Sequence, residues 1–158
     1  MPTNDNFGTL TTPPSRWSGV LTTGDTVELL AHAYGMEDER YVFSFLLKGK
    51  PHFEVTTLSM PVGLNEDEQW ETLSVGELLP TDGNDPCSLA LPIEHWSATL
   101  TTGDTLEVLA HEYAVKDERG VFSVLFKGQP NFMVALLSIP AALVKEVRNA
   151  NGELQWKK

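Results

Sequence analysis

An internal repeat constrains the fold of this chain more than any other feature of its sequence. Trp17 to Pro61 aligns without a gap on Trp96 to Pro140, at an offset of 79 residues, with 28 identities in 45 positions. Unrelated segments do not share this much sequence, so the chain contains an internal duplication. A unit of roughly 60 residues is marginally stable alone, whereas two such units gain stability by sharing one core. We therefore expect one domain with pseudo-two-fold symmetry.

The total length of 158 residues also fits one domain or two very small ones. We divide the chain into an N-terminal extension (1–16), a first repeat (17–75), an acidic connector (76–95) and a second repeat (96–158). The two repeats are expected to share a core rather than to form independent domains.

A β-hairpin is predicted in the second half of each repeat. Tyr41–Leu47 and His52–Met60 are rich in β-branched and aromatic residues, and Lys48–Pro51 between them contains a glycine typical of a turn. The second repeat has the same pattern around its own Lys-Gly-Gln-Pro turn. Near the C-terminus, Asn151-Gly152 lies between two extended runs and predicts a further hairpin.

The segment Thr26–Met36 and its counterpart Thr105–Val115 fit two kinds of element. Apolar residues at i, i+3, i+4 and i+7 are typical of a helix, whereas the alternation of apolar and polar residues is typical of a strand. Because the following segments are β, we favour a strand and keep the helix open. The prediction is an all-β fold of eight to ten strands in two tandem β-meander repeats, forming either a barrel or a two-sheet sandwich.

Comparison of the two repeats separates candidate core positions from candidate surface positions. Five large apolar pairs are identical and are expected in the shared core: Phe43/Phe122, Leu46/Leu125, Phe53/Phe132, Val55/Val134 and Leu58/Leu137. Five other pairs differ in charge, size or polarity and are expected at the surface or where the symmetry breaks: Ala33/Glu112, Tyr41/Gly120, Lys50/Gln129, His52/Asn131 and Glu54/Met133.

The charge is concentrated in one segment of the chain. The formal charge is −11, and residues 63–95 contain eight carboxylates with no lysine or arginine. This balance argues against nucleic acid as a partner, because binding to phosphates requires basic side chains. A solvated linker is the ordinary explanation for such a run, and a surface for a basic protein partner is the alternative. The candidate contacts with a partner are Glu66, Asp67, Glu68, Asp82 and Asp85.

Two histidine–tyrosine pairs are retained in both repeats and are the candidate ligand-binding residues. They are His32 with Tyr34 and His111 with Tyr113. The two histidines could meet near a pseudo-two-fold axis, where imidazole can act as a base or a ligand. The alternative is that each histidine only contacts a neighbouring carboxylate on the sheet.

No motif with recognisable catalytic chemistry is present in the sequence. Asp38-Glu39-Arg40 and Asp117-Glu118-Arg119 are retained, but each is interpreted as a charged turn between strands. The four histidines and the single Cys87 lack the spacing of a zinc site, and no phosphate-binding glycine loop or nucleophile motif occurs. We expect no metal, no cofactor and no catalytic residues.

These observations favour a non-enzymatic protein-interaction module, of an inhibitor, immunity or accessory type, that uses an acidic surface. One alternative is a β-barrel that binds a small apolar ligand, and a second is an enzyme that uses His32 and His111. The sequence has no run of 18 apolar residues and no cationic-then-apolar start, so we expect a cytoplasmic protein without a membrane partner. Unpaired strand edges also make a homo-oligomer a possible assembly.

Overall fold

The computed structural model describes residues 9–11, 14–65, 70–74, 88–90, 92–127 and 131–157. The strands of the first half are β1 Ser15–Val20, β2 Thr26–Ala31, β3 Ala33–Glu37, β4 Arg40–Leu47, β5 Phe53–Pro61 and β6 Trp70–Ser74. Those of the second half are β7 Glu94–Leu100, β8 Thr105–Ala110, β9 Glu112–Lys116, β10 Arg119–Phe126, β11 Phe132–Pro140, β12 Val144–Arg148 and β13 Leu154–Lys157. Two short 3-10 segments, η1 Val62–Asn65 and η2 Ala141–Leu143, follow β5 and β11.

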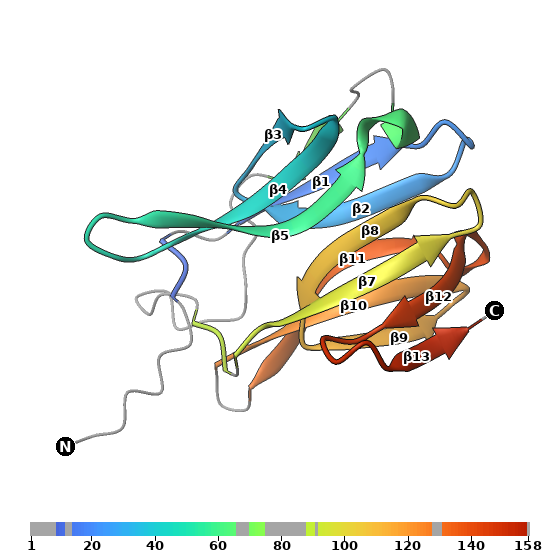
Figure 1. The fold of residues 1–158 in the computed structure, drawn as a ribbon. Helices are drawn as coiled ribbons and strands as arrows, with labels where there is room; N and C mark the ends of the chain where they lie inside the picture. Colours follow the sequence, from blue (N-terminus) through green and yellow to red (C-terminus); the bar gives the residue numbers. More distant parts are fainter. Residues whose placement is uncertain are drawn as a thin grey trace.

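The strands form two antiparallel sheets, and each sheet takes strands from both halves of the chain (Figure 1). One sheet has the order β6-β1-β2-β11-β10-β9, and the other has the order β13-β12-β7-β8-β5-β4-β3. The prediction of an all-β fold is confirmed. Among the described residues there is no helix long and apolar enough to cross a membrane.

The predicted alternative of a closed barrel is wrong. The two halves pair with each other once in each sheet, β2 with β11 and β5 with β8. Each sheet then ends in its own terminal strands, so the strand order does not run continuously from one sheet into the other. The reason is that the chain changes sheets repeatedly along the described elements, at β2–β3, β5–β6, β6–β7, β8–β9 and β11–β12, so each half is divided between two separate sheets.

The segments Thr26–Met36 and Thr105–Val115, which fitted either a helix or a strand, are both β, and each is divided into two strands. β2 and β3 cover the first segment, and β8 and β9 cover the second. Along β2 the side chains of Val27, Leu29 and Ala31 are buried at alternate positions, as expected for the core face of a strand, and Leu30 on the other face is buried as well. The break between β2 and β3 falls at His32, where the chain changes sheets.

Predicted turns of three kinds are confirmed in the structure, the first of them in both repeats. Asp38 and Glu39 connect β3 to β4, with φ angles of 51° and 62°, and Asp117 and Glu118 do the same between β9 and β10 with 50° and 64°. Positive φ at both central residues is characteristic of a type I′ hairpin turn, whose twist matches that of the flanking strands. Residues 48–52 connect the predicted hairpin of β4 and β5.

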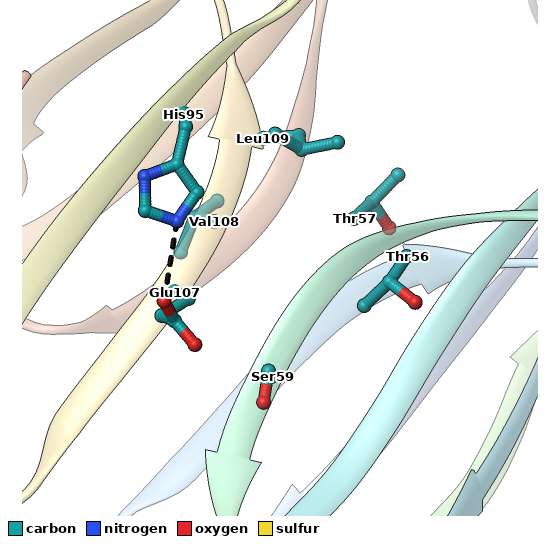
Figure 2. A pocket seen from close by; sticks show the side chains of 7 residues that line it. All are labelled: Thr56, Thr57, Ser59, His95, Glu107, Val108 and Leu109. Atoms are coloured by element: carbon teal, nitrogen blue, oxygen red, sulfur yellow. Dashed lines mark ion pairs between the residues drawn. The ribbon is translucent and has the colours of Figure 1, made fainter. Parts of the chain in front are cut away.

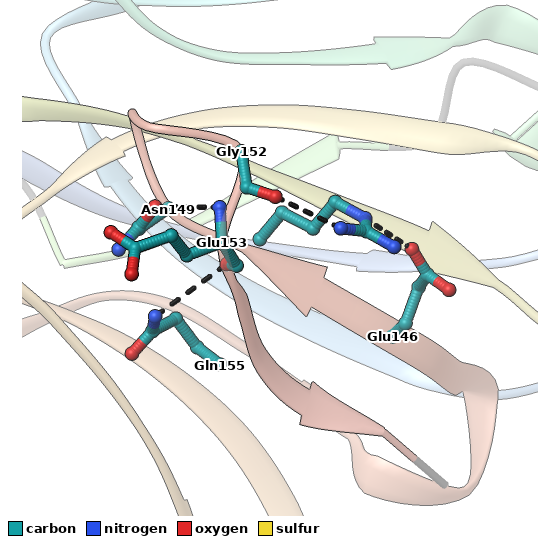
Figure 3. Close-up of polar contacts among 6 residues, drawn as sticks. Glu146, Asn149, Gly152, Glu153 and Gln155 are labelled. Atoms are coloured by element: carbon teal, nitrogen blue, oxygen red, sulfur yellow. Dashed lines mark hydrogen bonds and ion pairs between the residues drawn. The ribbon is translucent and has the colours of Figure 1, made fainter.

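The C-terminal Asn-Gly hairpin is the third confirmed turn and joins β12 to β13 (Figure 3). Gly152 has a φ of 79° and donates its backbone N–H to the carbonyl of Asn149. The side-chain oxygen of Asn149 accepts the backbone N–H groups of Asn151 and Glu153 at 3.0 Å each. Arg148 Nε donates to the carboxylate of Glu146, two residues earlier on β12, at 2.7 Å.

Residues 9–11 and 88–90 lie beside the hairpins and beside each other. Leu10 bridges to Leu47 at the end of β4, and Leu89 bridges to Phe126 at the end of β10. Thr9 bridges to Ser88, and their hydroxyl oxygens are 3.0 Å apart. Leu10 and Leu89 are both buried, so these segments contribute to the core.

The expected core is confirmed in part. Phe43, Phe122, Leu58 and Leu137 are buried in the main apolar cluster, while the pairs Leu46/Leu125 and Val55/Val134 are half-buried. The prediction is wrong for Phe53, which is 49% exposed. Phe53 is the first residue of β5, opposite Leu47 and directly after the turn, so it lies at the outer end of the hairpin.

The positions that differ between the repeats are exposed in most cases, as expected. Ala33, Glu112, Lys50, His52, Asn131, Glu54 and Met133 are exposed. The pair Tyr41 and Gly120 does not lie at the surface, because both residues are buried. Gly120 lies against the ring of Tyr113, so this pair marks an internal difference in packing between the two halves.

Candidate functional site

The two retained histidines complete the backbone hydrogen bonding of the hairpin strands. His32 Nδ1 accepts the backbone N–H of Leu46 at 2.8 Å, and His111 Nδ1 accepts that of Leu125 at 2.8 Å. The pairing of β3 with β4 ends at Ser44, and the pairing of β9 with β10 ends at Ser123. Each imidazole therefore accepts a backbone N–H just beyond the end of the strand pairing. A nitrogen that accepts such a bond carries no proton. This contact favours a structural role for the imidazole.

The two retained tyrosines pack in aromatic clusters of their own halves. The Tyr34 ring is 5.3 Å from that of Trp17 and 5.5 Å from that of Phe43. The Tyr113 ring is 4.7 Å from Phe122 and 6.2 Å from Trp156. The Tyr113 hydroxyl is buried and has no hydrogen-bond partner among the described residues, and burial raises the pKa of Tyr113 to about 12. The phenol therefore stays neutral well above its ordinary range.

The candidate partner contacts of the acidic segment lie outside the described residues. These are Glu66, Asp67, Glu68, Asp82 and Asp85. Within the part of the chain that the structure describes, no group of three or more histidine, cysteine, aspartate and glutamate side chains is placed to hold a metal ion.

The structure reveals a site that the sequence analysis did not find, where β5 of the first half pairs with β8 of the second. We name it the junction pocket; its volume is about 190 Å³, and its lining residues are Thr56, Thr57, Ser59, His95, Glu107, Val108 and Leu109 (Figure 2). Three strands supply these residues, because β7 pairs with the other side of β8. Pairing between the halves thus creates the site.

One side of the pocket holds a histidine and a carboxylate in contact. His95 Nε2 lies 3.4 Å from Glu107 Oε1, and both side chains are just over half exposed, at 53% and 54%. Because water reaches both groups, the pair contributes little to stability. Its significance is that it places one carboxylate at the mouth of the pocket.

The opposite side of the pocket is formed by hydroxyl groups of β5. Thr57 is buried, and its hydroxyl donates to the carbonyl of Phe43 at 3.4 Å. The Ser59 hydroxyl accepts a hydrogen bond from Arg40 Nε at 2.6 Å. Since Arg40 and not a base contacts this oxygen, its environment is not that of an activated nucleophile.

Arg40 also fixes the two halves to each other next to the pocket. Its Nη2 donates to the carbonyl of Ser59 at 3.1 Å and to the carbonyl of Thr105 on β8 at 2.8 Å. These bonds hold the guanidinium against the backbone. The pocket therefore lies in a part of the sheet that is held by strand pairing and by a side chain across the junction.

The equivalent junction between β11 and β2 has different chemistry. At the matching positions, 79 residues away, Ala135, Leu136 and Arg16 replace Thr56, Thr57 and His95. Leu30 is only 1% exposed there, whereas its counterpart Leu109 is half-buried, so the second junction is less open at this position. These substitutions are visible in the aligned repeats and are the signal that could have pointed to the site.

Comparison of this chain with protein-family models, curated proteins and solved structures finds no match. The functional argument therefore depends on the geometry of the site.

Proposed function

We propose that this protein is a non-enzymatic protein-interaction module that acts in the cytoplasm and binds a basic protein partner. The observation that carries the proposal is the junction pocket, a small hollow on a β-sheet with an exposed carboxylate in its lining. Its size supports a contact with a single side chain. Pockets that enclose small molecules measure roughly 300–1,000 Å³, whereas this one measures about 190 Å³.

The other candidate functions have less support from the geometry. The apolar-ligand carrier needs a barrel mouth, and the two sheets do not close into a barrel. The enzyme would use His32 and His111, and the Nδ1 atom of each accepts a backbone N–H of a hairpin strand, which supports a structural role for these imidazoles. In the junction pocket, the serine hydroxyl is bound by an arginine.

We also propose that the two repeats are related by a pseudo-two-fold axis and share one core. Recurrence of contacts supports this. Arg40 binds the carbonyl of Thr105 at 2.8 Å, and Arg119, its counterpart 79 residues later, binds the carbonyl of Thr26 at 2.8 Å. The partner in each case belongs to the other repeat. A duplicated domain has two equivalent junctions, and a difference between them marks the one that has acquired a function.

The acidic segment is proposed as a second contact surface for the same partner. Charge reversal of Glu66, Asp67 and Glu68 to lysine is expected to weaken partner binding at low salt, where screening of exposed charges is least. Unchanged binding at low salt would remove this segment from the proposal and leave the junction pocket as the contact.

The proposal is tested by affinity capture from the native source with matched variants. The wild-type chain and Glu28→Lys are expected to retain the same polypeptide, while Glu107→Lys loses it. The two positions are equivalent, because Glu107 lies opposite Ser59 and Ser97, and Glu28 lies opposite Ser138 and Ser18. Equal capture by all three proteins, or no specific polypeptide at all, would contradict the proposed role of this face.

A further inference from the structure

We infer that the junction pocket binds a lysine side chain of the partner. This inference rests on the proposed function and specifies which side chain of the partner is recognised. The lining of the pocket combines the exposed carboxylate of Glu107 with hydroxyl groups of β5 and the half-buried apolar side chain of Leu109. An ammonium group at the end of an apolar stem matches this arrangement.

The acceptors of the pocket suit an ammonium better than a guanidinium. An ammonium has three separate donors, whereas a guanidinium pairs best with both oxygens of one carboxylate. Here Glu107 Oε1 already faces His95 at 3.4 Å, which disturbs bidentate pairing but leaves acceptor positions on the second oxygen. Thr56, which is exposed, supplies a further hydroxyl acceptor on β5, the strand across the pocket from Glu107 (Figure 2).

The apolar part of the lining accounts for the rest of a lysine side chain. Leu109 lines the pocket with a half-buried apolar side chain, and lysine packs its methylene stem on apolar surface while its charge stays in contact with polar groups. A pocket of about 190 Å³ has room for one side chain of this kind and not for a folded ligand.

The charges around the pocket are compatible with a cationic guest. The chain has a net charge of −11, which attracts basic partners over a longer range than any single contact. Arg40 is the neighbouring cation, but its guanidinium is bound to the backbone of Ser59 and Thr105. The position that matches His95 in the other junction is Arg16, so the carboxylate of that junction has an arginine and not a histidine at the neighbouring position.

The test uses the full chain and a defined probe, Nα-acetyl-lysine amide, followed by amide chemical shifts in two-dimensional NMR. The lysine amide is expected to cause saturable shifts at Thr56, Ser59, Glu107 and Leu109, with a millimolar dissociation constant. Nα-acetyl-norleucine amide has a similar apolar stem without the charge and is expected to cause no saturable shift. Nα-acetyl-arginine amide is expected to bind more weakly than the lysine amide.

Matched variants separate this inference from nonspecific attraction of a cation. Glu107→Gln is expected to lower the affinity for the lysine amide at least about fivefold, because one charge-assisted hydrogen bond is lost. Glu28→Gln is expected to leave this affinity unchanged. Equal binding of the norleucine amide, tighter binding of the arginine amide, or equal effects of the two variants would each overturn the lysine assignment.

The outcomes also separate the inference from the proposed function. If the partner is captured in a manner that depends on Glu107 while the lysine amide does not bind, the interaction module stands and the lysine pocket is wrong. If neither the capture nor the probe depends on Glu107, both are wrong.

Discussion

Single residues adjust the packing of the two repeats so that similar sequences enclose different interiors. In the first half, Tyr41 is buried and its ring packs edge-on against Trp70 at 5.5 Å. The second half has Gly120 at that position, and the Tyr113 ring occupies the adjacent space. The second half has no side chain at the position of Tyr41, and the ring of Tyr113 packs against the glycine there.

Gly120→Ala is therefore expected to destabilise the protein. A Cβ at this position would lie 2.5 Å from the Tyr113 hydroxyl oxygen and 3.1 Å from Tyr113 Cε1. We expect a loss of roughly 1–3 kcal/mol in the free energy of unfolding, as for other overpacked interiors, measured by urea denaturation. Gly35→Ala is the control, because a Cβ there would meet nothing within 4 Å. Equal losses in the two variants would contradict the packing argument.

Alkaline pH tests the burial of the Tyr113 hydroxyl. The pKa is raised to about 12 in the folded protein, above the ordinary value of about 10 that applies in the unfolded chain. The unfolded chain therefore releases this proton first, and the contribution to stability is lost as pH rises from about 10 to about 12. In a Tyr113→Phe variant, the fall in stability over that range should be smaller. An unchanged slope would contradict the assignment.

At the scale of elements, short turns with demanding backbone geometry define the hairpins. Asp38 and Glu39 both have positive φ, a conformation that is unfavourable for residues with a Cβ. The double variant Asp38→Asn with Glu39→Gly introduces the Asn-Gly pair that this turn type prefers, and it is expected to stabilise the protein by about 1 kcal/mol. The midpoint of thermal unfolding measures this effect. A lower midpoint would show that the acidic side chains contribute contacts of their own.

The elements that could be predicted from the sequence are those determined by neighbouring residues. Asn151-Gly152 predicts its hairpin because both the turn and its strands lie within a short segment. The change of sheets at His32 was not predictable, since alternation along β2 and β3 is the same whichever sheet each strand joins. The exposure of Phe53 also escaped prediction, because identity between the repeats does not distinguish a core position from the end of a hairpin.

The junction pocket escaped prediction for a related reason. Its hydroxyls come from β5 and its carboxylate from β8, and these strands are brought together by the pairing of Leu58 with Val108 and of Ser59 with Glu107. No local pattern indicates which strand of one repeat pairs with which strand of the other. The difference between Thr56-Thr57 and Ala135-Leu136 was visible in the aligned repeats, but it gained a meaning only once the two junctions could be compared.

At the scale of the whole molecule, the two halves are expected to unfold together. Each sheet contains strands of both halves, and buried residues from both form one apolar cluster. Leu58→Ala and Leu137→Ala, in opposite halves, should each lower the midpoint of a single urea transition, with a loss of roughly 2–5 kcal/mol. Circular dichroism and tryptophan fluorescence should give the same curve. Two separated transitions would show that the repeats are independent.

The central claim is that this protein acts by binding another protein, and its most direct test is the mass of the native assembly. The chain, isolated gently from its source, would be weighed under native and denaturing conditions. We expect an excess native mass equal to a second polypeptide of a different kind, which is lost at high salt and reduced by Glu107→Lys but not by Glu28→Lys. A native mass equal to the monomer of 17.5 kDa, or an excess the size of a small molecule, would contradict it.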